Sequence, residues 1–493
     1  MAEAVPQLGI TGDTAVELAY MAAALAFILG IRRLSGVRTA AAGNRIAALG
    51  MLIAIGATLG LLWRVEALWI VAGGMGVGAL VGALLATRVP MTAMPEMVAL
   101  LNGFGGAASL LVALSEVDHF RSHPATDTET LVFRFQAAHS LVGGPDYATA
   151  IVLSILIGGV TFAGSLVAWS KLAGKVKGNR LWGLGQKPVN ALLAIAAVAL
   201  AVWAAYFAGA DGAMLWTSLA LALFALVLGV GLVVPIGGAD MPVVIALLNS
   251  YSGIAAMTTG FVLRNNLLIV AGSLVGASGI ILTRIMCRAM NRSLANVLFG
   301  GLGAEAPSAA AGEAGYTKVK STTADEIAPL LDAARLVIFV PGYGLAVAQA
   351  QHKTRELADL LQEKGCVVKY AIHPVAGRMP GHMNVLLAEA DVPYEQLFEL
   401  EHINSEFKNA DVVLVLGAND VCNPAAVEDA SSPIAGMPVL HVWEARTVVI
   451  VKRSLSAGYA GIRNGLFEMD NALMLFADAK KALEDLITAL KTV

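Results

Sequence analysis

A short glycine motif in the C-terminal part of the chain has the composition of a phosphate-binding turn. It reads Gly342-Tyr343-Gly344-Leu345-Ala346-Val347 and lies between a predicted strand, Leu336–Val340, and a predicted helix, Ala346–Lys364. Glycines there let the backbone approach a phosphate, and a helix N-terminus favours an anion. Valine replaces the third glycine of a dinucleotide fingerprint, so a plain strand-to-helix turn stays the alternative.

A second motif has the chemistry to choose between phosphorylated and unphosphorylated dinucleotides. NAD sites usually place an acid at the end of the second strand, where it binds the ribose hydroxyls. Here that strand ends at His373, without an acid. A later strand ends instead in Lys452-Arg453-Ser454, whose two cations and hydroxyl suit a 2′-phosphate through charge-assisted hydrogen bonds. We therefore expect NADP here, and an exposed basic strand end is the alternative.

Three further loops follow strand ends, which is where sheets of this kind bind ligands. We expect Arg378 to bind a pyrophosphate, and Asn419 and Asp420 to accept hydrogen bonds from a ribose or the nicotinamide amide. Tyr459 would belong to a lid over the cofactor. Each loop alone has an ordinary structural alternative. The loop residues that we assign to the site are Val375, Ala376, Gly377, Arg378, Met379, Pro380, Gly417, Ala418, Asn419, Asp420, Gly458, Tyr459 and Gly461.

A parallel sheet is needed to bring these loops together. Strand-like and helix-like stretches alternate beyond residue 335, which predicts a cytoplasmic α/β, Rossmann-like, doubly wound parallel sheet. The predicted strands are Leu336–Val340, Val367–His373, Asp411–Leu416, Pro438–Trp443, Thr447–Lys452 and Leu473–Phe476. The predicted helices are Ala346–Lys364, Gly381–Ala390, Glu401–Asn409 and Asp478–Leu490.

The N-terminal part is a succession of long apolar runs. The chain has 493 residues, of which 57% are hydrophobic and 14% charged. This composition is too apolar for a chain that is soluble over its whole length. Since about 20 apolar residues cross a bilayer, we predict a polytopic helical domain with spans near 14–31, 46–63, 67–87, 95–114, 148–170, 188–207, 213–235, 241–262 and 266–286. The segment Leu131–Val142 is amphipathic and is expected at the interface, after a loop at Ser115–Glu129.

Charge and cysteine content restrict the setting of the protein. Arginines and lysines follow the first, third and fifth spans and surround the end of the ninth, which predicts an external N-terminus and a cytoplasmic C-terminal domain. We divide the chain into a membrane domain (1–295), a linker (296–325) and a nucleotide-binding domain (326–493). A net charge of -3 without a basic cluster argues against nucleic acid. Three cysteines without ligand spacing predict neither a disulfide framework nor a metal site. The first run has no preceding Lys or Arg, which argues against a cleaved signal peptide.

The membrane part contains an internal repeat. Two Met-Pro pairs, Met94-Pro95 and Met241-Pro242, are each followed by an asparagine at the same spacing, Asn102 and Asn249. In a helix, each asparagine lies about 12 Å deeper in the membrane than its methionine. Such amides tie membrane helices together, or they line a polar path for protons or water. Glu96 and Asp240 lie where these helices meet the cytoplasmic side, so they are either solvated acids or coupling residues.

Longer motifs resemble the β subunit of proton-translocating NAD(P) transhydrogenase over nearly the whole chain. They are Gly342–Gln351, His373–Ala390, Gly417–Asp420, Lys452–Ser454 and Gly458–Gly461, with Gly237–Pro242 and Leu247–Gly253 in the membrane part. The resemblance implies an NADP(H)-binding domain here, NAD(H) on a partner α subunit, and a dimer of αβ units in the bacterial inner membrane. It implies that hydride passes directly between the cofactors, so that no side chain is catalytic.

The resemblance also implies roles for particular residues. In the nucleotide site it assigns the turn to Gly342, Gly344 and Val347, the pyrophosphate contact to Arg378, and the 2′-phosphate contacts to Lys452, Arg453 and Ser454. It also places Asn419 and Asp420 in the site, and Tyr459 in the loop over the nucleotide. In the membrane it ties Ser165, Asp240 and Asn249 to proton translocation or its coupling, and we add Asn102 and Ser250 to the predicted path.

One position departs from the family pattern. Some members carry histidine at the position of Asn102, and an amide does not titrate near neutral pH. The titrating group then lies on the partner subunit, or a chain of water molecules serves. Two alternatives to the family function are a transporter gated by a nucleotide-sensing domain and a membrane-anchored dehydrogenase. The first requires substrate-selective groups in the spans, and the second requires only one or two spans.

Overall fold

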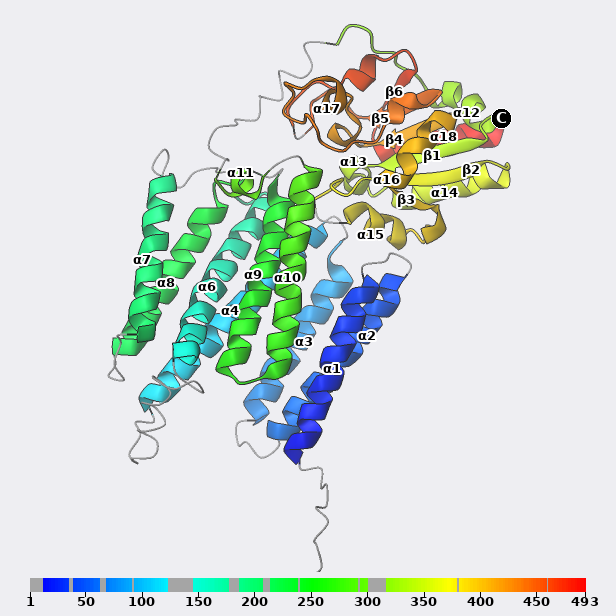
Figure 1. The fold of residues 1–493 in the computed structure, drawn as a ribbon. Coiled ribbons are helices and arrows are strands. Elements are labelled where there is room, and N and C mark those ends of the chain that lie inside the picture. The colour runs from blue at the N-terminus through cyan, green and yellow to red at the C-terminus, as the bar shows by residue number, and fades with distance from the viewer. Residues whose placement is uncertain are drawn as a thin grey trace, which may run out of the picture.

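The protein consists of a bundle of long helices and an α/β domain beyond one end of it (Figure 1). The computed structural model describes residues 12–34, 39–62, 68–90, 93–122, 145–176, 186–206, 213–237, 240–290, 293–299, 316–378, 381–458 and 460–493. The predicted interfacial segment Leu131–Val142 lies outside these residues, as do Met379, Pro380 and Tyr459.

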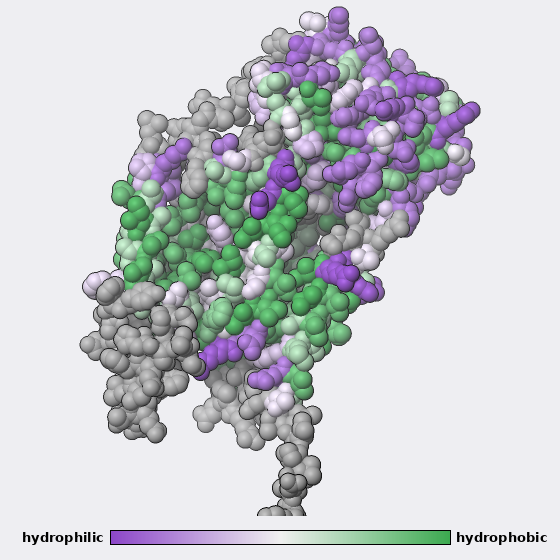
Figure 2. Space-filling model, viewed as in Figure 1, coloured by the Kyte–Doolittle hydropathy of each residue, from purple (hydrophilic) through white to green (hydrophobic). Residues whose placement is uncertain are grey.

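The nine predicted spans are confirmed as helices within the described part of the chain. They are α1 (Gly12–Leu34), α2 (Ala40–Leu62), α3 (Leu68–Arg88), α4 (Met94–Ser122), α6 (Pro145–Leu172), α7 (Gln186–Tyr206), α8 (Ala213–Val233), α9 (Met241–Val262) and α10 (Asn266–Ala289). Each is long and apolar enough to cross a membrane, and their outer surface is a hydrophobic band below the polar α/β domain (Figure 2). The loop predicted from Ser115 is wrong as far as Ser122, because α4 continues to that residue.

The two halves of the internal repeat pack in the same way. Both repeated helices, α4 and α9, begin at the methionine of a Met-Pro pair, where proline needs no hydrogen-bond donor. Helix α4 packs on α6 and α9 packs on α10, and glycines allow both pairs to approach closely. A Cβ on Gly106 of α4 would lie 2.7 Å from the carbonyl oxygen of Gly158 on α6, and one on Gly253 of α9 would lie 2.5 Å from the nitrogen of Gly276 on α10.

The α/β domain is built on six parallel strands in the order β3-β2-β1-β4-β5-β6. The strands are β1 (Leu336–Pro341), β2 (Val367–Ile372), β3 (Leu397–Glu399), β4 (Val412–Leu416), β5 (Thr447–Lys452) and β6 (Ala472–Phe476). The order reverses between β1 and β4, which is the point where doubly wound sheets bind ligands. Helices cover the sheet: α12 (Ala324–Asp332), α13 (Tyr343–Val347), α14 (Gln351–Glu363), α15 (His382–Glu389), α16 (Leu400–Ile403), α17 (Ala425–Glu428) and α18 (Ala479–Thr492). The Rossmann-like fold class is therefore confirmed.

Some predicted elements of this domain are wrong. The segment predicted as the strand Pro438–Trp443 is not a strand, and a 3-10 turn begins at Val442. Its apolar residues, including the fully buried Leu440, pack against one face of the sheet from a loop. The strand β3 was not predicted, because three residues are too few to show a periodic pattern.

The predicted helices are also revised. The helix predicted at Ala346–Lys364 is interrupted after Val347, where Gln349 has a φ of 49°, and it resumes at Gln351. The helix predicted at Glu401–Asn409 continues beyond Ile403 as 3-10 turns. The helices α11 (Leu294–Phe299) and α12 were not predicted.

The chain reaches the sheet before α12. The ring of Tyr316 packs at a tilt against that of Phe467, with centroids 5.7 Å apart, and Ser321 forms a parallel bridge with Met474. The domain limits 1–295, 296–325 and 326–493 stay predictions.

Candidate functional site

The glycine turn packs directly on the loop that follows β4. The amide of Gly342 donates to Leu416 O at 2.9 Å, and the amide of Gly344 donates to Gly417 O at 2.9 Å. A Cβ on Gly342 would lie 2.5 Å from the Cα of Ala418, and Gly417 has a φ of 67°, where glycine is favoured. These glycines are therefore required for two backbones to meet at the strand-order reversal. The predicted phosphate contact of this turn stays a prediction.

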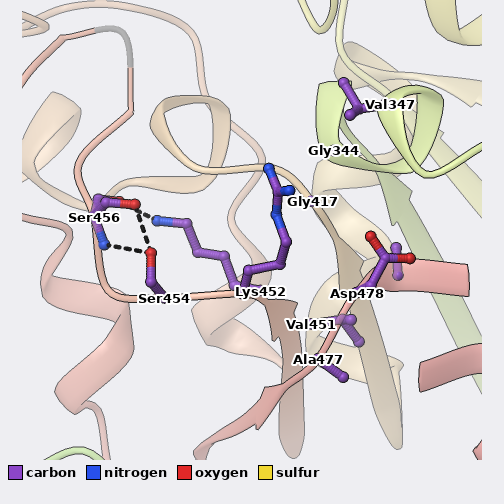
Figure 3. A pocket seen from close by; sticks show the side chains of 11 residues that line it. Gly344, Val347, Gly417, Val451, Lys452, Ser454, Ser456, Ala477 and Asp478 are labelled. Carbon is purple, nitrogen blue, oxygen red and sulfur yellow. Dashed lines mark hydrogen bonds between the residues drawn. The ribbon is translucent and has the colours of Figure 1, made fainter. Parts of the chain in front are cut away.

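A cleft of about 470 Å³ joins this turn to the basic end of β5 (Figure 3). The residues around it come from α13, from the carboxyl ends of β4 and β5, and from the start of α18. They are Gly344, Val347, Gly417, Val451, Lys452, Arg453, Ser454, Ser456, Ala477, Asp478 and Ala479. The structure thus brings together the two motifs, about 110 residues apart in the sequence, that were predicted to bind a phosphorylated dinucleotide.

The two cations of this cleft have different surroundings. Lys452 is half-buried and donates to the carbonyl oxygen of Ser456, as the dashed line in Figure 3 shows. Arg453 lines the same cleft but is exposed. Burial lowers the pKa of Lys452 to about 8, although Asp420 acts in the opposite direction. Lys452 therefore carries a charge at neutral pH and loses it in mildly alkaline solution.

Asn419 and Asp420 join the loops after β4 and β5. The side-chain amide of Asn419 is oriented with its oxygen facing two donors, Gly458 N at 2.8 Å and Lys452 Nζ at 2.9 Å. Asp420 Oδ2 accepts from Ala460 N at 3.0 Å. A Cβ on Gly458 would lie 2.4 Å from Asp420 Oδ1, so only glycine fits beside this carboxylate. The predicted loops at Gly417–Asp420 and Gly458–Gly461 are thus in contact, and Asn419 of the first loop also contacts Lys452.

The Arg378 loop lies beside the glycine turn. The guanidinium carbon of Arg378 lies 4.4 Å from the ring centroid of Tyr343, a cation–π contact between the two predicted segments. Gly377 has a φ of 110°, and a Cβ there would lie 2.5 Å from the ring of His382. The backbone amide of Arg378 donates to Nδ1 of that ring at 3.0 Å. The loop is therefore held by a buried histidine at the start of α15.

Two buried histidines of this loop were missed as site residues in the sequence. His373 accepts from Val375 N through Nδ1 at 3.2 Å, and its Nε2 lies 2.7 Å from Pro438 O. Burial lowers the pKa of His373 to about 4, so the ring is neutral and donates from Nε2. Burial, with Arg378 nearby, also lowers the pKa of His382. The signal for them in the sequence was a histidine at each end of the glycine-containing loop.

The Arg378 loop also faces the helical bundle. Helix α15, which follows it, lies on the side of the α/β domain nearest the bundle (Figure 1). Arg378 and Glu96, in the first turn of α4, interact electrostatically. Lys175, which follows α6, also interacts with Glu96. A residue predicted to bind the nucleotide thus interacts with the start of a repeated membrane helix.

The predicted membrane residues lie mostly in helix contacts. Asn102 is 6% exposed, and its Nδ2 donates to Ile245 O on α9 at 3.2 Å, one turn from Asn249. Ser250 is fully buried and donates to Gly276 O on α10 at 2.6 Å. Ser165 is fully buried, and its hydroxyl has no hydrogen-bond partner among the described residues.

Two further predicted membrane residues differ in burial. Asp240 is 6% exposed and directly precedes α9, whereas Asn249 is only half-buried. None of these membrane residues lines the cleft beside Lys452.

These features define a class of protein: a nine-helix membrane domain, within the described residues, that carries a dinucleotide-type Rossmann domain. A family model described as NAD(P) transhydrogenase beta subunit matches residues 16–489. The NAD(P) transhydrogenase subunit beta of Rhodospirillum rubrum is 49% identical over 479 residues, covering 96% of this chain and 98% of that protein. A second R. rubrum sequence of the same name, from strain ATCC 11170, matches to the same extent.

The chain belongs to the NAD(P) transhydrogenase β-subunit family, an enzyme family. The resemblance seen in the sequence is therefore confirmed. The alternative of a nucleotide-gated transporter is not favoured by this match.

Proposed function

We propose that this chain is the NADP(H)-binding, proton-conducting β subunit of a proton-translocating transhydrogenase. The observation that carries the proposal is the cleft that joins the Gly342–Val347 turn to Lys452 and Arg453. A separate α subunit holds NAD(H), in a dimer of αβ units. The complex lies in the bacterial inner membrane, with the α/β domain in the cytoplasm and the N-terminus outside.

The residues of the cleft suit NADP(H) better than NAD(H). The exposed guanidinium of Arg453 binds the 2′-phosphate, and the ammonium of Lys452 adds a second charge from the wall of the cleft. Ser454 is placed by its hydroxyl contact with Ser456, at 2.7 Å. At the end of β2, where an NAD site carries an acid, the buried His373 is occupied by backbone contacts and offers no carboxylate to a ribose.

The chemistry of hydride transfer is supplied by the bound nucleotides. When it is bound, NADP(H) supplies the hydride acceptor or donor, and the protein contributes position. Arg378 contacts the pyrophosphate from its place beside Tyr343. Met379, Pro380 and Tyr459 stay predicted contacts of the nucleotide. No side chain transfers a proton in that step.

Proton passage along α4, α6 and α9 changes how tightly the α/β domain holds NADP(H). Asn102, Ser165, Asn249 and Ser250 line the path, and Asp240 and Glu96 connect it to the domain. The connection is supported by the electrostatic interaction of Glu96 with Arg378. A proton-motive force near 180 mV supplies roughly 4 kcal/mol per proton, which corresponds to about a thousandfold in affinity. This coupling must be reciprocal, so nucleotide occupancy also changes proton affinity.

The test of nucleotide choice compares NADPH and NADH binding to the full chain in detergent. We expect Arg453→Ala to weaken NADPH binding by about tenfold to a hundredfold, because a hydrogen bond to a charged group contributes about 1.5–3 kcal/mol. NADH binding stays within about twofold, because NADH has no 2′-phosphate. The control is Arg446→Ala, since Arg446 is exposed and lies before β5, away from the cleft. Equal affinity for the two nucleotides in the unmodified chain refutes the assignment.

A second experiment tests the partner and the proton. The full chain is reconstituted in vesicles with and without the α subunit, and hydride exchange and lumenal acidification are measured together. We expect both only when the α subunit is present. Hydride exchange by this chain alone contradicts the partner requirement, and exchange that is indifferent to an imposed pH gradient contradicts proton coupling.

A further inference from the structure

A line of polar side chains runs along the contact between α4 and α6. On α4, Asn102, Ser109 and Glu116 follow one another at intervals of seven residues, and on α6 Tyr147, Ser154 and Thr161 do the same. Seven residues are nearly two helical turns, so each set lies on one face of its helix. The helices run in opposite directions with these faces together, because Gly106 contacts Gly158 at one level and Glu116 contacts Tyr147 at another.

The inner members of this line are buried and uncharged. Asn102, Ser109, Ser154 and Thr161 are each at most 6% exposed. Asn102 donates to Ile245 O on α9, and Ser154 donates to Thr258 Oγ1 on α9 at 2.8 Å. The other repeated helix, α9, therefore borders the same line. None of these four side chains can gain or lose a proton near neutral pH.

The line ends at a carboxyl group. Tyr147 OH donates to Glu116 Oε1 at 2.6 Å. Glu116 is partly exposed, whereas its neighbour Val117 is buried and the Tyr147 ring packs against the apolar cluster that contains Val117 and Leu221. The carboxyl thus lies between the buried line and the surface at the end of the bundle opposite the α/β domain, which we call the distal end (Figure 1).

The position of Glu116 along α4 matches a site for proton exchange. Fourteen residues separate it from Asn102, which is about 21 Å along a helix. The hydrocarbon core of a bilayer is about 30 Å thick, so the line between them spans most of it. An ionisable group in an apolar helix is costly to place there and usually has a function.

We propose that Glu116 is the group that exchanges protons between the distal side and this polar line, with Tyr147 as its positioning residue. The carboxylate takes a proton from a hydronium ion at the distal end, leaving a water molecule, and becomes a carboxylic acid. It then releases that proton to a water molecule within the line and becomes a carboxylate again. Tyr147 keeps its own proton and donates its hydrogen bond. The inference rests on the proposed proton path, and it supplies the titratable group that Asn102 cannot provide.

Other charged groups in this region contribute to the electrostatic potential at the Glu116 carboxyl. Asp118 is exposed two residues further along α4. Arg264, in the turn between α9 and α10, interacts electrostatically with Tyr147. Tyr147 is the titratable group that α6 presents to Glu116 in the described residues. The expected pH dependence belongs to this set of groups, with Glu116 as the member that lies on the line.

The experiment uses the complete αβ complex in sealed vesicles. NADPH added outside reaches only molecules whose α/β domain faces outward, so their distal end faces the lumen and the lumenal pH can be set separately. We expect Glu116→Gln to lower proton pumping at least about tenfold and to abolish the dependence of turnover on lumenal pH. Glu116→Asp restores both in part. Asp118→Asn is the matched control and behaves as the unmodified complex.

Two further variants separate the possible outcomes. Tyr147→Phe keeps the ring but removes the hydroxyl, and it shifts the midpoint of the lumenal-pH dependence because the carboxylate loses a hydrogen bond. Asn102→Leu tests the path itself. If Asn102→Leu stops pumping while Glu116→Gln pumps within about twofold and keeps the lumenal-pH dependence, the assignment of Glu116 is wrong. If Asn102→Leu pumps normally, the proposed path is wrong. Unchanged helical content by circular dichroism and intact assembly with the α subunit show that each variant is folded.

Discussion

If Lys452 binds the 2′-phosphate as proposed, its half-buried ammonium makes NADPH affinity depend on pH in a way that can be calculated. Its pKa is lowered to about 8, so about nine tenths of the molecules carry this charge at pH 7 and about one tenth at pH 9. The 2′-phosphate loses its second proton near pH 6 and stays fully charged over this range. The charge that changes between pH 7 and pH 9 is therefore that of Lys452, and not that of the 2′-phosphate.

The direction of this pH dependence follows from the thermodynamic linkage between phosphate binding and protonation of Lys452. Bound phosphate favours the charged amine and raises its pKa, so binding is strongest below about pH 8 and weakens as pH rises through that value. If the phosphate raises this pKa by one unit or more, affinity at pH 9 is about fivefold to tenfold lower than at pH 7. The binding of NADH, which lacks the 2′-phosphate, changes little over the same range.

The assay measures the binding of NADPH to the full chain between about pH 7 and pH 9.5 through the fluorescence of the nicotinamide. Lys452→Arg is the decisive variant, because a guanidinium stays charged throughout this range. Its affinity is expected to show no break near pH 8. If Lys452→Arg and the unmodified chain weaken in parallel, the pH dependence has another source and Lys452 does not serve the 2′-phosphate.

Two substitutions test the glycine contacts. Gly342→Ala places a Cβ 2.5 Å from the Ala418 backbone, so we expect it to destabilise the α/β domain by more than about 2 kcal/mol. Thermal unfolding measures this loss, and Gly465→Ala, with open space around its Cβ, is the control that stays near the unmodified value. Gly106→Ala places a Cβ 2.7 Å from Gly158 O, so it separates α4 from α6 and lowers proton pumping more than NADPH binding. Equal loss of both contradicts a local effect in the bundle.

The sequence predicted the elements whose physical signal is strong. The nine spans were found because a helix needs about 20 consecutive apolar residues to cross a bilayer. Apolar runs of that length are characteristic of membrane-spanning helices. The strands β1, β4 and β5 were found because both of their faces are buried, which produces continuous apolar runs. The buried loop around Leu440 has the same apolar composition as a strand, so its sequence alone led to a wrong assignment.

The candidate site could be predicted only in part. The motifs at Gly342 and Lys452 were recognisable because each has a composition typical of one chemistry. The roles of His373 and His382 were not, because their hydrogen bonds go to backbone groups, Pro438 O and Arg378 N, whose positions depend on the folded loops and not on residue type. The pairing of Glu116 with Tyr147 was not predicted either, because it depends on the register between α4 and α6.

The proposed coupling has a short physical route. Tyr343, in the glycine turn, contacts Arg378, and Arg378 interacts electrostatically with Glu96 at the start of α4. The same helix carries Asn102 at one level and Glu116 near its other end. A pyrophosphate that binds Arg378 neutralises part of the charge facing Glu96, so nucleotide occupancy changes the electrostatic potential at the first turn of α4. Since coupling is reciprocal, a charge that moves along α4 must in turn change the affinity of Arg378 for that pyrophosphate.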